Sequence, residues 1–307
     1  GETAVMVMHA VAEAPLLLKL EGHASLPGRT CVVPRVGALE TVVFFPGDLS
    51  LPKSEMLRDE MLRGYASWSA EDLTRTLAVR FPCYHTVTVL PSRHVLGFSC
   101  YDGGFLDQVN ETGDPMDGKY SSEGTCCAHV LALLLHTRAR CPSLQSSRLH
   151  LLGFSKGGVV LNQILSELGA ETVSTAAEQL LHMVASISWL DPGLNRPGPV
   201  FLEDSAQLRR AALRLAALAP SPPRLSVALT PYTSSTHRCG WWPSAAALLW
   251  LLLPRAWTES STVAKLHQFE AALTLHGLPL RRQECSLHEP PSLRGHFAVL
   301  KDFHAPW

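Results

Sequence analysis

The sequence predicts an α/β fold, a mostly parallel, doubly wound sheet with helices on both faces. Two observations predict it: short apolar or β-branched runs recur along the chain, and segments with helical apolar spacing lie between them. The runs are apolar at consecutive positions rather than alternating, which is typical of strands buried on both faces. Strands that alternate with helices pair in parallel, because each helix carries the chain back across the sheet.

Six strands and six helices are expected in chain order. The strands are expected at residues 41–45, 85–90, 149–152, 183–190, 225–230 and 280–287. The helices are expected at residues 73–80, 125–138, 156–168, 176–182, 203–218 and 261–276. Ser69 is the predicted N-cap of the first helix, and Gly277 ends the last one. We expect one domain over residues 1–307, with an apolar, tryptophan-rich insertion or flap at residues 237–258.

The composition is that of a globular protein with a large core. The 307 residues are 46% hydrophobic and 17% charged, against about 25% charged in average proteins. The net charge of −1 gives no electrostatic reason to expect nucleic acid as a partner. The longest apolar run, residues 245–253, is about half of what a membrane-spanning helix needs, so no transmembrane segment is expected. Without CxxC or HExxH spacing, no metal or cofactor is expected, and the eight cysteines are expected to be mostly reduced and buried.

The strongest local motif is GFSKG at residues 153–157, which fits G-x-S-x-G. It follows the expected strand 149–152 and precedes an apolar-periodic helix, as a nucleophile elbow does. Such a turn strains the serine backbone and directs its hydroxyl above the sheet, at a helix N-terminus that favours negative charge. The alternative is an ordinary turn in which the serine is an N-cap. Ser155 is therefore the predicted nucleophile of an α/β-hydrolase-like protein.

A serine nucleophile needs a histidine base, which in α/β hydrolases follows the last strand. The histidines in or near this part of the chain are His267, His276, His288, His296 and His304. His267 and His276 fall on an expected helix, where exposed polar positions are common. We favour His296, on an expected loop that Gly295 allows to bend sharply, with His288 as the alternative.

The third member of the triad is an acid that orients the imidazole. Asp191 directly follows the expected strand 183–190, at the carboxyl edge where sites form in parallel sheets. Its alternative role is that of a turn residue before proline and glycine. The usual position for the acid follows the next strand, but the sequence there, TPYTS at residues 230–234, contains none. We therefore predict Asp191, with Glu289 and Asp302 as alternatives.

The oxyanion hole is expected from two backbone amides, one after an early strand and one after the nucleophile. The amides of Asp48 and Lys156 are predicted, with Gly47 or Leu49 as alternatives for the first. A carboxylate at this position disfavours an oxyanion unless the side chain points away and ties down the loop. The Lys156 side chain is expected to be solvated, with contact to an anionic substrate as the alternative.

These motifs together resemble the family of the vertebrate mitochondrial protein encoded by chromosome 2 open reading frame 69. The resemblance covers about residues 40–303, and its most specific segments are FSCYD at residues 98–102 and GFSKG with VVLNQ at residues 153–163. It implies an α/β-hydrolase-like fold, a mitochondrial address, a link to respiratory-chain upkeep and no established substrate. The shorter GFSKGG stretch is also similar to GFSQGG of carboxylesterases and acyl-protein thioesterases.

Carried over from this family, the elbow serine falls on Ser155, the acid on Asp191 and the histidine on His296. The chain departs from the family in its longer apolar segment 237–258 and in the missing acid after Thr230. The sequence thus predicts a mitochondrial serine hydrolase that acts on an ester or thioester. The alternative is a hydrolase-like mitochondrial protein that has no catalytic role and acts through protein partners.

Overall fold

The computed structural model describes most of the chain. The described residues are 14–116, 119–144, 148–196, 198–218, 220–234, 260–285 and 290–306. The expected apolar insertion, residues 237–258, lies outside them, and so do His288 and Glu289.

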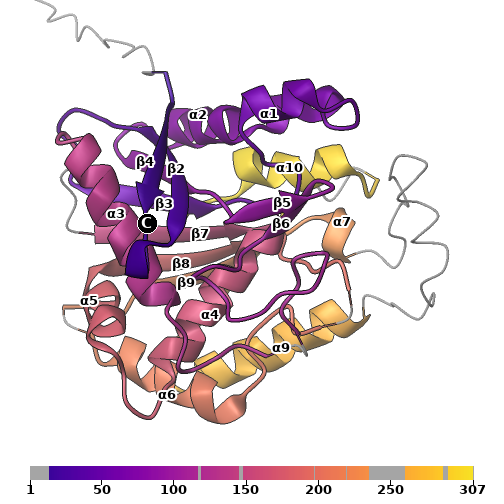
Figure 1. Cartoon of the computed structure of the whole chain (residues 1–307). Coiled ribbons are helices and arrows are strands. Elements are labelled where there is room, and N and C mark those ends of the chain that lie inside the picture. The colour runs from indigo at the N-terminus through magenta and orange to yellow at the C-terminus, as the bar shows by residue number, and fades with distance from the viewer. Residues whose placement is uncertain are drawn as a thin grey trace, which may run out of the picture.

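A single eight-stranded sheet organises the described residues, in the order β1-β2-β4-β3-β7-β8-β9-β10 (Figure 1). Its strands are β1 Leu16–Glu21, β2 Pro27–Val33, β3 Glu40–Phe45, β4 His85–Val89, β7 Arg148–Phe154, β8 Val184–Leu190, β9 Arg224–Leu229 and β10 Leu280–Glu284. All neighbours from β4 to β10 pair in parallel, whereas β1–β2 and β2–β4 are antiparallel. The predicted fold class, a mostly parallel α/β sheet, is confirmed.

All six expected strands are present, and the structure adds four more. The antiparallel β1 and β2 extend the sheet at one end, and β5 (Arg93–Val95) pairs with β6 (Phe98–Cys100) as a separate hairpin. The last expected strand, residues 280–287, is shorter than predicted, because β10 ends at Glu284. The added strands carry mixed polar and apolar residues, so their pairing is not visible in a search for continuous apolar runs.

Helices cover both faces of the sheet. The longer ones are α1 Lys53–Arg58, α2 Ala70–Arg80, α3 Cys126–Arg140, α4 Gly158–Leu168, α5 Thr175–Met183, α6 Ser205–Ala216, α9 Ser260–Thr274 and α10 Leu293–Asp302, and a short α7 spans Pro231–Ser234. Helices α2 and α10 pack together on one face, whereas α3, α4, α5, α6 and α9 form a connected layer on the other (Figure 1). Ser69 caps α2 as expected, because its hydroxyl accepts the Asp72 amide.

Each face of the sheet has its own hydrophobic core. Along β3 the side chains alternate, so that Val43 belongs to the core under α3 and α4 and Phe44 to the core under α2 and α10. Leu151 and Leu152 divide in the same way along β7, and all four side chains are fully buried. A strand between two helical layers needs apolar residues at every position, which explains the continuous runs in the sequence.

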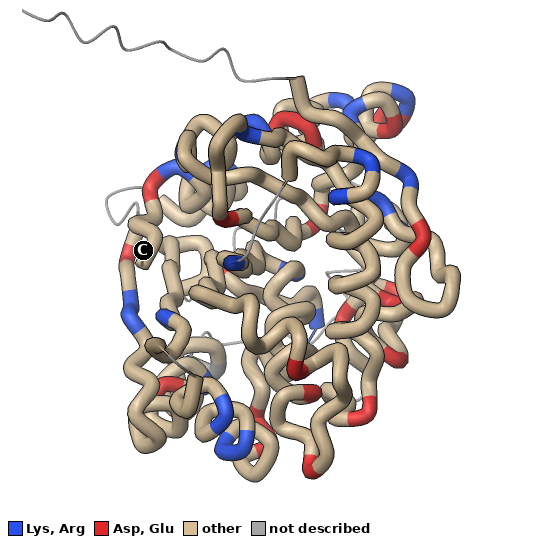
Figure 2. The backbone as a smooth tube through the Cα atoms, turned by 90° about the vertical axis from the view of Figure 1, so that its left-hand side faces the viewer, with Lys and Arg blue, Asp and Glu red and all other residues tan. Residues whose placement is uncertain are grey.

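Charges of both signs occur along the described chain. Figure 2 shows Lys and Arg as well as Asp and Glu on several of its segments. None of the described helices is long and apolar enough to cross a membrane. Seven cysteines are free in the described residues and six of them are buried, as expected for reduced thiols.

Candidate active site

Ser155 lies at a sharp turn between a strand and a helix. It directly follows β7 and begins a short 3-10 helix, Ser155–Gly157, that leads into α4. Its backbone φ is +51°, a left-handed conformation that non-glycine residues rarely adopt and that marks functional turns. The expected strand–turn–helix arrangement around the GFSKG motif is therefore present, with the serine side chain half-buried at its apex.

The glycine after the serine is required by close packing of backbone. A Cβ at Gly157 would lie 1.9 Å from the Phe45 carbonyl oxygen at the end of β3. A side chain here would push the turn away from the neighbouring strand, so the motif's second glycine sets how near β3 comes to Ser155.

Asp191 directly follows β8, and its carboxylate is fully buried and surrounded by donors. Its Oδ2 lies 2.5 Å from Nδ1 of His296 and 2.5 Å from the Thr230 hydroxyl. Its Oδ1 accepts the Thr230 amide at 2.8 Å and the Thr233 hydroxyl. The buried Asp191 carboxylate thus has four hydrogen-bond donors. The His296 imidazole is held in place through its Nδ1, which faces this carboxylate.

Thr230 and Thr233 belong to the candidate site and were not predicted from the sequence. They lie just after β9, where an acid is usual in this fold, and they contribute hydroxyls instead. These hydroxyls hold the carboxylate that comes from the end of β8. Two threonines three residues apart in the acid-free TPYTS segment were the available signal.

The expectation that His296 lies on a bent loop is wrong. His296 lies in the first turn of α10, and Gly295 does not bend the chain, because its amide donates to the Ser292 side chain at 3.0 Å as part of the helix N-cap. Phe297 and Leu300 are buried on the same side of this helix. Helical burial of this face directs the imidazole inward, toward the carboxyl edge of the sheet.

The His296 ring is packed between two aromatic rings. The centroids of Phe154 and Tyr232 each lie 4.5 Å from the imidazole centroid, with an angle of 33° between the ring planes. Phe154 is the residue directly before Ser155, so this contact places the imidazole beside the turn that carries Ser155. The His296 side chain is only 5% exposed, which shields its hydrogen bond to Asp191 from water.

Two of the alternatives for the triad are exposed to solvent rather than buried with Asp191 and His296. Asp302 is exposed at the last turn of α10, and the His267 side chain on α9 is 60% exposed. No group of His, Cys, Asp and Glu side chains in the described residues could hold a metal ion.

The loop after β3 passes directly over Ser155. A Cβ on Gly47 would lie 2.6 Å from the Ser155 Cβ and 3.1 Å from its Oγ, so only glycine fits. The loop is held by the FSCYD segment, where the Ser99 hydroxyl donates to the Gly47 carbonyl at 2.7 Å and the Tyr101 hydroxyl to the Pro46 carbonyl at 2.8 Å. The Leu49 amide donates to the Gly97 carbonyl at 2.9 Å. This amide is therefore not free to serve as the alternative donor of an oxyanion hole.

The Asp48 side chain ties this loop to two other segments. Its carboxylate accepts the Ser99 amide at 2.7 Å and the Asn195 side-chain amide at 2.8 Å. Burial raises the pKa of the Asp48 carboxyl, and the nearby Lys156 ammonium opposes that rise. The Asp48 carboxylate therefore fixes the loop through these hydrogen bonds, which is the condition under which an aspartate is compatible with an oxyanion hole.

Both readings of the Lys156 side chain, solvated or facing an anionic substrate, are wrong. The side chain is 1% exposed and forms a buried ion pair with Asp114. Its ammonium also donates to the Thr112 carbonyl at 2.9 Å. Asp114 in turn accepts the backbone amides of Asn195 at 3.0 Å and Arg196 at 2.8 Å. The ion pair and these hydrogen bonds join the loops that carry Asp114 and Asn195 to the turn that carries Ser155. A buried charge is costly without such a close partner of opposite sign.

Comparison with solved structures bears on the fold. The chain is similar to the siderophore hydrolase EstB from Aspergillus nidulans, with a TM-score of 0.50 and 13% identity over 94% of this chain and 92% of that one. It is equally similar to a poly(aspartic acid) hydrolase from Sphingomonas sp. KT-1, with a TM-score of 0.50 and 13% identity over 93% of this chain and 97% of that one. At such low identity these likenesses show the fold, which is that of an α/β hydrolase.

Comparison of sequences identifies relatives. The mitochondrial protein C2orf69 homolog of Danio rerio is 29% identical over 282 residues, 85% of this chain and 72% of the relative. The human mitochondrial protein C2orf69 is 26% identical over 205 residues, and the match spans about half of each protein. The names of these relatives place them, and with them this chain, in mitochondria. The family model described as C2orf69 matches residues 33–142 and 129–233, about two thirds of the sequence. This chain therefore belongs to the C2orf69 family.

Proposed function

We propose that the protein is a serine hydrolase that cleaves an ester or thioester by acyl transfer. The observation that carries the proposal is the His296–Asp191 hydrogen bond beside a serine at positive φ. A serine hydroxyl becomes a competent nucleophile when an oriented imidazole takes its proton, and a buried carboxylate stabilises the imidazolium that results.

In the proposed reaction, the Ser155 hydroxyl oxygen attacks the substrate carbonyl and the imidazole of His296 takes the proton. Because Nδ1 donates to Asp191, Nε2 is the nitrogen that remains to act as the base. His296 then protonates the leaving alcohol or thiol, and water releases the acyl group from Ser155 in a second cycle. The reaction needs no cofactor.

The oxyanion formed in each step is assigned to backbone amides. The amide of Lys156 follows the nucleophile, and the amide of Asp48, or of Gly47, comes from the loop that crosses Ser155. The contacts of Asp48, Ser99 and Tyr101 support this assignment, because they hold the loop rigid before substrate binds. Preorganised donors of this type each contribute about 3–4 kcal/mol to transition-state stabilisation.

Labelling with a fluorophosphonate probe tests the nucleophile. The folded wild type is expected to react at one site, and Ser155→Ala is expected to abolish the reaction. Ser54→Ala, on the exposed surface of α1, is the matched control and should react like the wild type. Failure of well-folded wild type to react would contradict the hydrolase proposal and favour a role in binding protein partners.

Substitution of Asp191 by Asn tests the rest of the triad. The change keeps the side-chain volume but removes the charge that stabilises the imidazolium. A loss of about 10⁴-fold in the labelling rate is expected, from a comparable triad. The rate of hydrolysis of phenyl thioester and phenyl ester substrates, measured by release of the leaving group, should fall by the same factor. A rate within threefold of the wild type would exclude Asp191 as the triad acid.

A further inference from the structure

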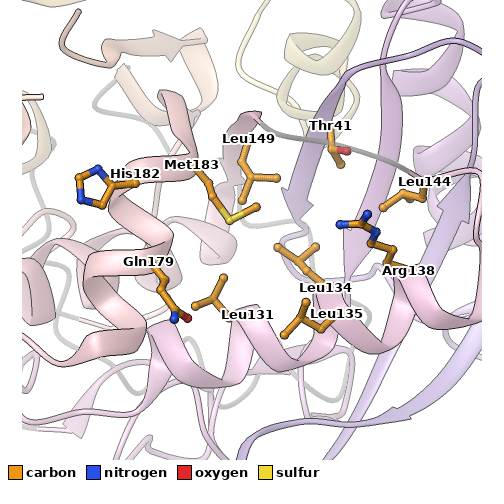
Figure 3. Close-up of a pocket in the computed structure, with 10 residues that line it drawn as sticks. All are labelled: Thr41, Leu131, Leu134, Leu135, Arg138, Leu144, Leu149, Gln179, His182 and Met183. Atoms are coloured by element: carbon orange, nitrogen blue, oxygen red, sulfur yellow. The ribbon is translucent and has the colours of Figure 1, made fainter. Parts of the chain in front are cut away.

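A second candidate binding site lies at the opposite edge of the sheet from Ser155. It is a cavity of about 400 Å³ between α3 and α5, where Thr41 near the start of β3 and Leu149 near the start of β7 form its floor (Figure 3). Leu149 and Ser155 are six residues apart along the strand direction, which corresponds to about 20 Å. The cavity is therefore separate from the proposed catalytic site, and its volume is in the range of small-molecule sites.

Most of the cavity wall is aliphatic. Figure 3 shows the side chains of Leu131 and Leu134 from α3, Leu149 from β7 and Met183 from the end of α5 pointing toward one another across it. Flexible methionine and leucine side chains adapt to an alkyl chain, and burial of such a chain against them is favourable in proportion to its area.

Polar groups lie at both ends of the cavity. Arg138, in the last turn of α3, has its guanidinium on the same side of the cavity as Thr41 and Leu144, whereas Gln179 and His182 lie on the opposite side (Figure 3). The Thr41 hydroxyl is fully buried, so a ligand in the cavity does not reach it. Arg138 is therefore the polar group that carries a charge able to hold an anion.

Arg138 is the one lining residue with a permanent charge. None of the ten residues that line the cavity is acidic, and the arginine ion pairs within the described part of the chain belong to other arginines. A planar guanidinium binds a carboxylate through two parallel hydrogen bonds. An aliphatic wall with one cation at one end matches a molecule with an alkyl chain and a terminal carboxylate.

We propose that this cavity binds a fatty acid, with the carboxylate on Arg138 and the alkyl chain among Leu131, Leu134, Leu149 and Met183. The inference does not depend on catalysis at Ser155. It commits to the free acid, since an ester lacks the charge that Arg138 recognises.

Calorimetric titration with dodecanoate, below its micellar concentration, tests the proposal. One molecule is expected to bind per chain, and methyl dodecanoate is expected to bind at least about tenfold more weakly. Arg138→Gln is expected to weaken dodecanoate at least about tenfold and to leave the methyl ester unchanged. Arg140→Gln, in the same last turn but outside the cavity lining, is the matched control and should change the affinity less than about twofold.

Two outcomes would overturn the proposal. The first is equal binding of dodecanoate by wild type and Arg138→Gln, both shown to be folded by circular dichroism. The second is loss of dodecanoate binding after fluorophosphonate has reacted with Ser155, because the acid would then occupy the catalytic site. Retained binding in Ser155→Ala and in the labelled protein supports a separate site, even if the catalytic proposal fails.

Discussion

The buried ion pair between Lys156 and Asp114, next to Ser155, allows a quantitative test by Lys156→Met. The substitution keeps the length of the side chain and removes its charge, which leaves the Asp114 carboxylate buried without a cation. The two side chains are 1% and 4% exposed, so the carboxylate cannot be rehydrated without opening the site.

The expected cost follows from what Asp114 retains. Removal of one partner from a buried pair costs about 3–5 kcal/mol. Asp114 would still accept the amides of Asn195 and Arg196 and the Thr112 hydroxyl at 2.9 Å, which solvate part of its charge. We therefore expect the low end of the range, a loss of about 3 kcal/mol in the free energy of unfolding.

Urea unfolding followed by tryptophan fluorescence measures this loss. Lys53→Met is the matched control, since Lys53 pairs with Asp72 at 2.7 Å but is 46% exposed, and such surface pairs contribute about 0–1 kcal/mol. Lys156→Met combined with Asp114→Asn removes both charges, and the double variant should lose less than the sum of the two single variants. A loss for Lys156→Met within about 0.5 kcal/mol of the Lys53→Met value would refute the reasoning.

Two further predictions concern the loop over the nucleophile and a buried histidine. Gly47→Ala is expected to slow fluorophosphonate labelling of Ser155 by about 100-fold, because the new Cβ displaces the loop or the serine. Gly64→Ala, with open space around its Cβ position, should label at the wild-type rate, and equal rates for both variants would contradict the crossing geometry. Burial lowers the pKa of His129 to about 4, so between pH 4 and 6.5 the folded state binds fewer protons than the unfolded state. The free energy of unfolding should therefore fall as the pH drops through this window, and His129→Leu should reduce the slope measured by urea titrations at several pH values. An unchanged slope would show that His129 does not titrate on unfolding.

Structural elements that are set by residues adjacent in the chain could be predicted from the sequence. The Ser69 cap and the GFSKG turn were visible because the residue types that form them are neighbours in the chain. The helix around His296 was missed, because the Ser292 cap stands three residues before a glycine that is more often found in loops. A glycine in the first turn is tolerated there because Phe297 and Leu300 anchor the helix against the core.

The environment of the site's charges was not predictable in the same way. Lys156 stands on a helix N-terminus next to the nucleophile, where a lysine is usually solvated. Its burial results from the loop that carries Asp114, 42 residues earlier in the chain. Asp191 is likewise held by Thr230 and Thr233, which follow a different strand.

The sequence by itself determined six of the strands and the sharp turn that carries Ser155. Apolar runs and turn residues act over a few positions, and parallel strands bring their carboxyl ends to one edge regardless of detail. Only the tertiary structure decided how charged side chains are satisfied, since a buried charge takes whichever partner the packing of distant loops supplies. The same limit holds for the cavity under α3 and α5, because its walls meet only after the helices have packed.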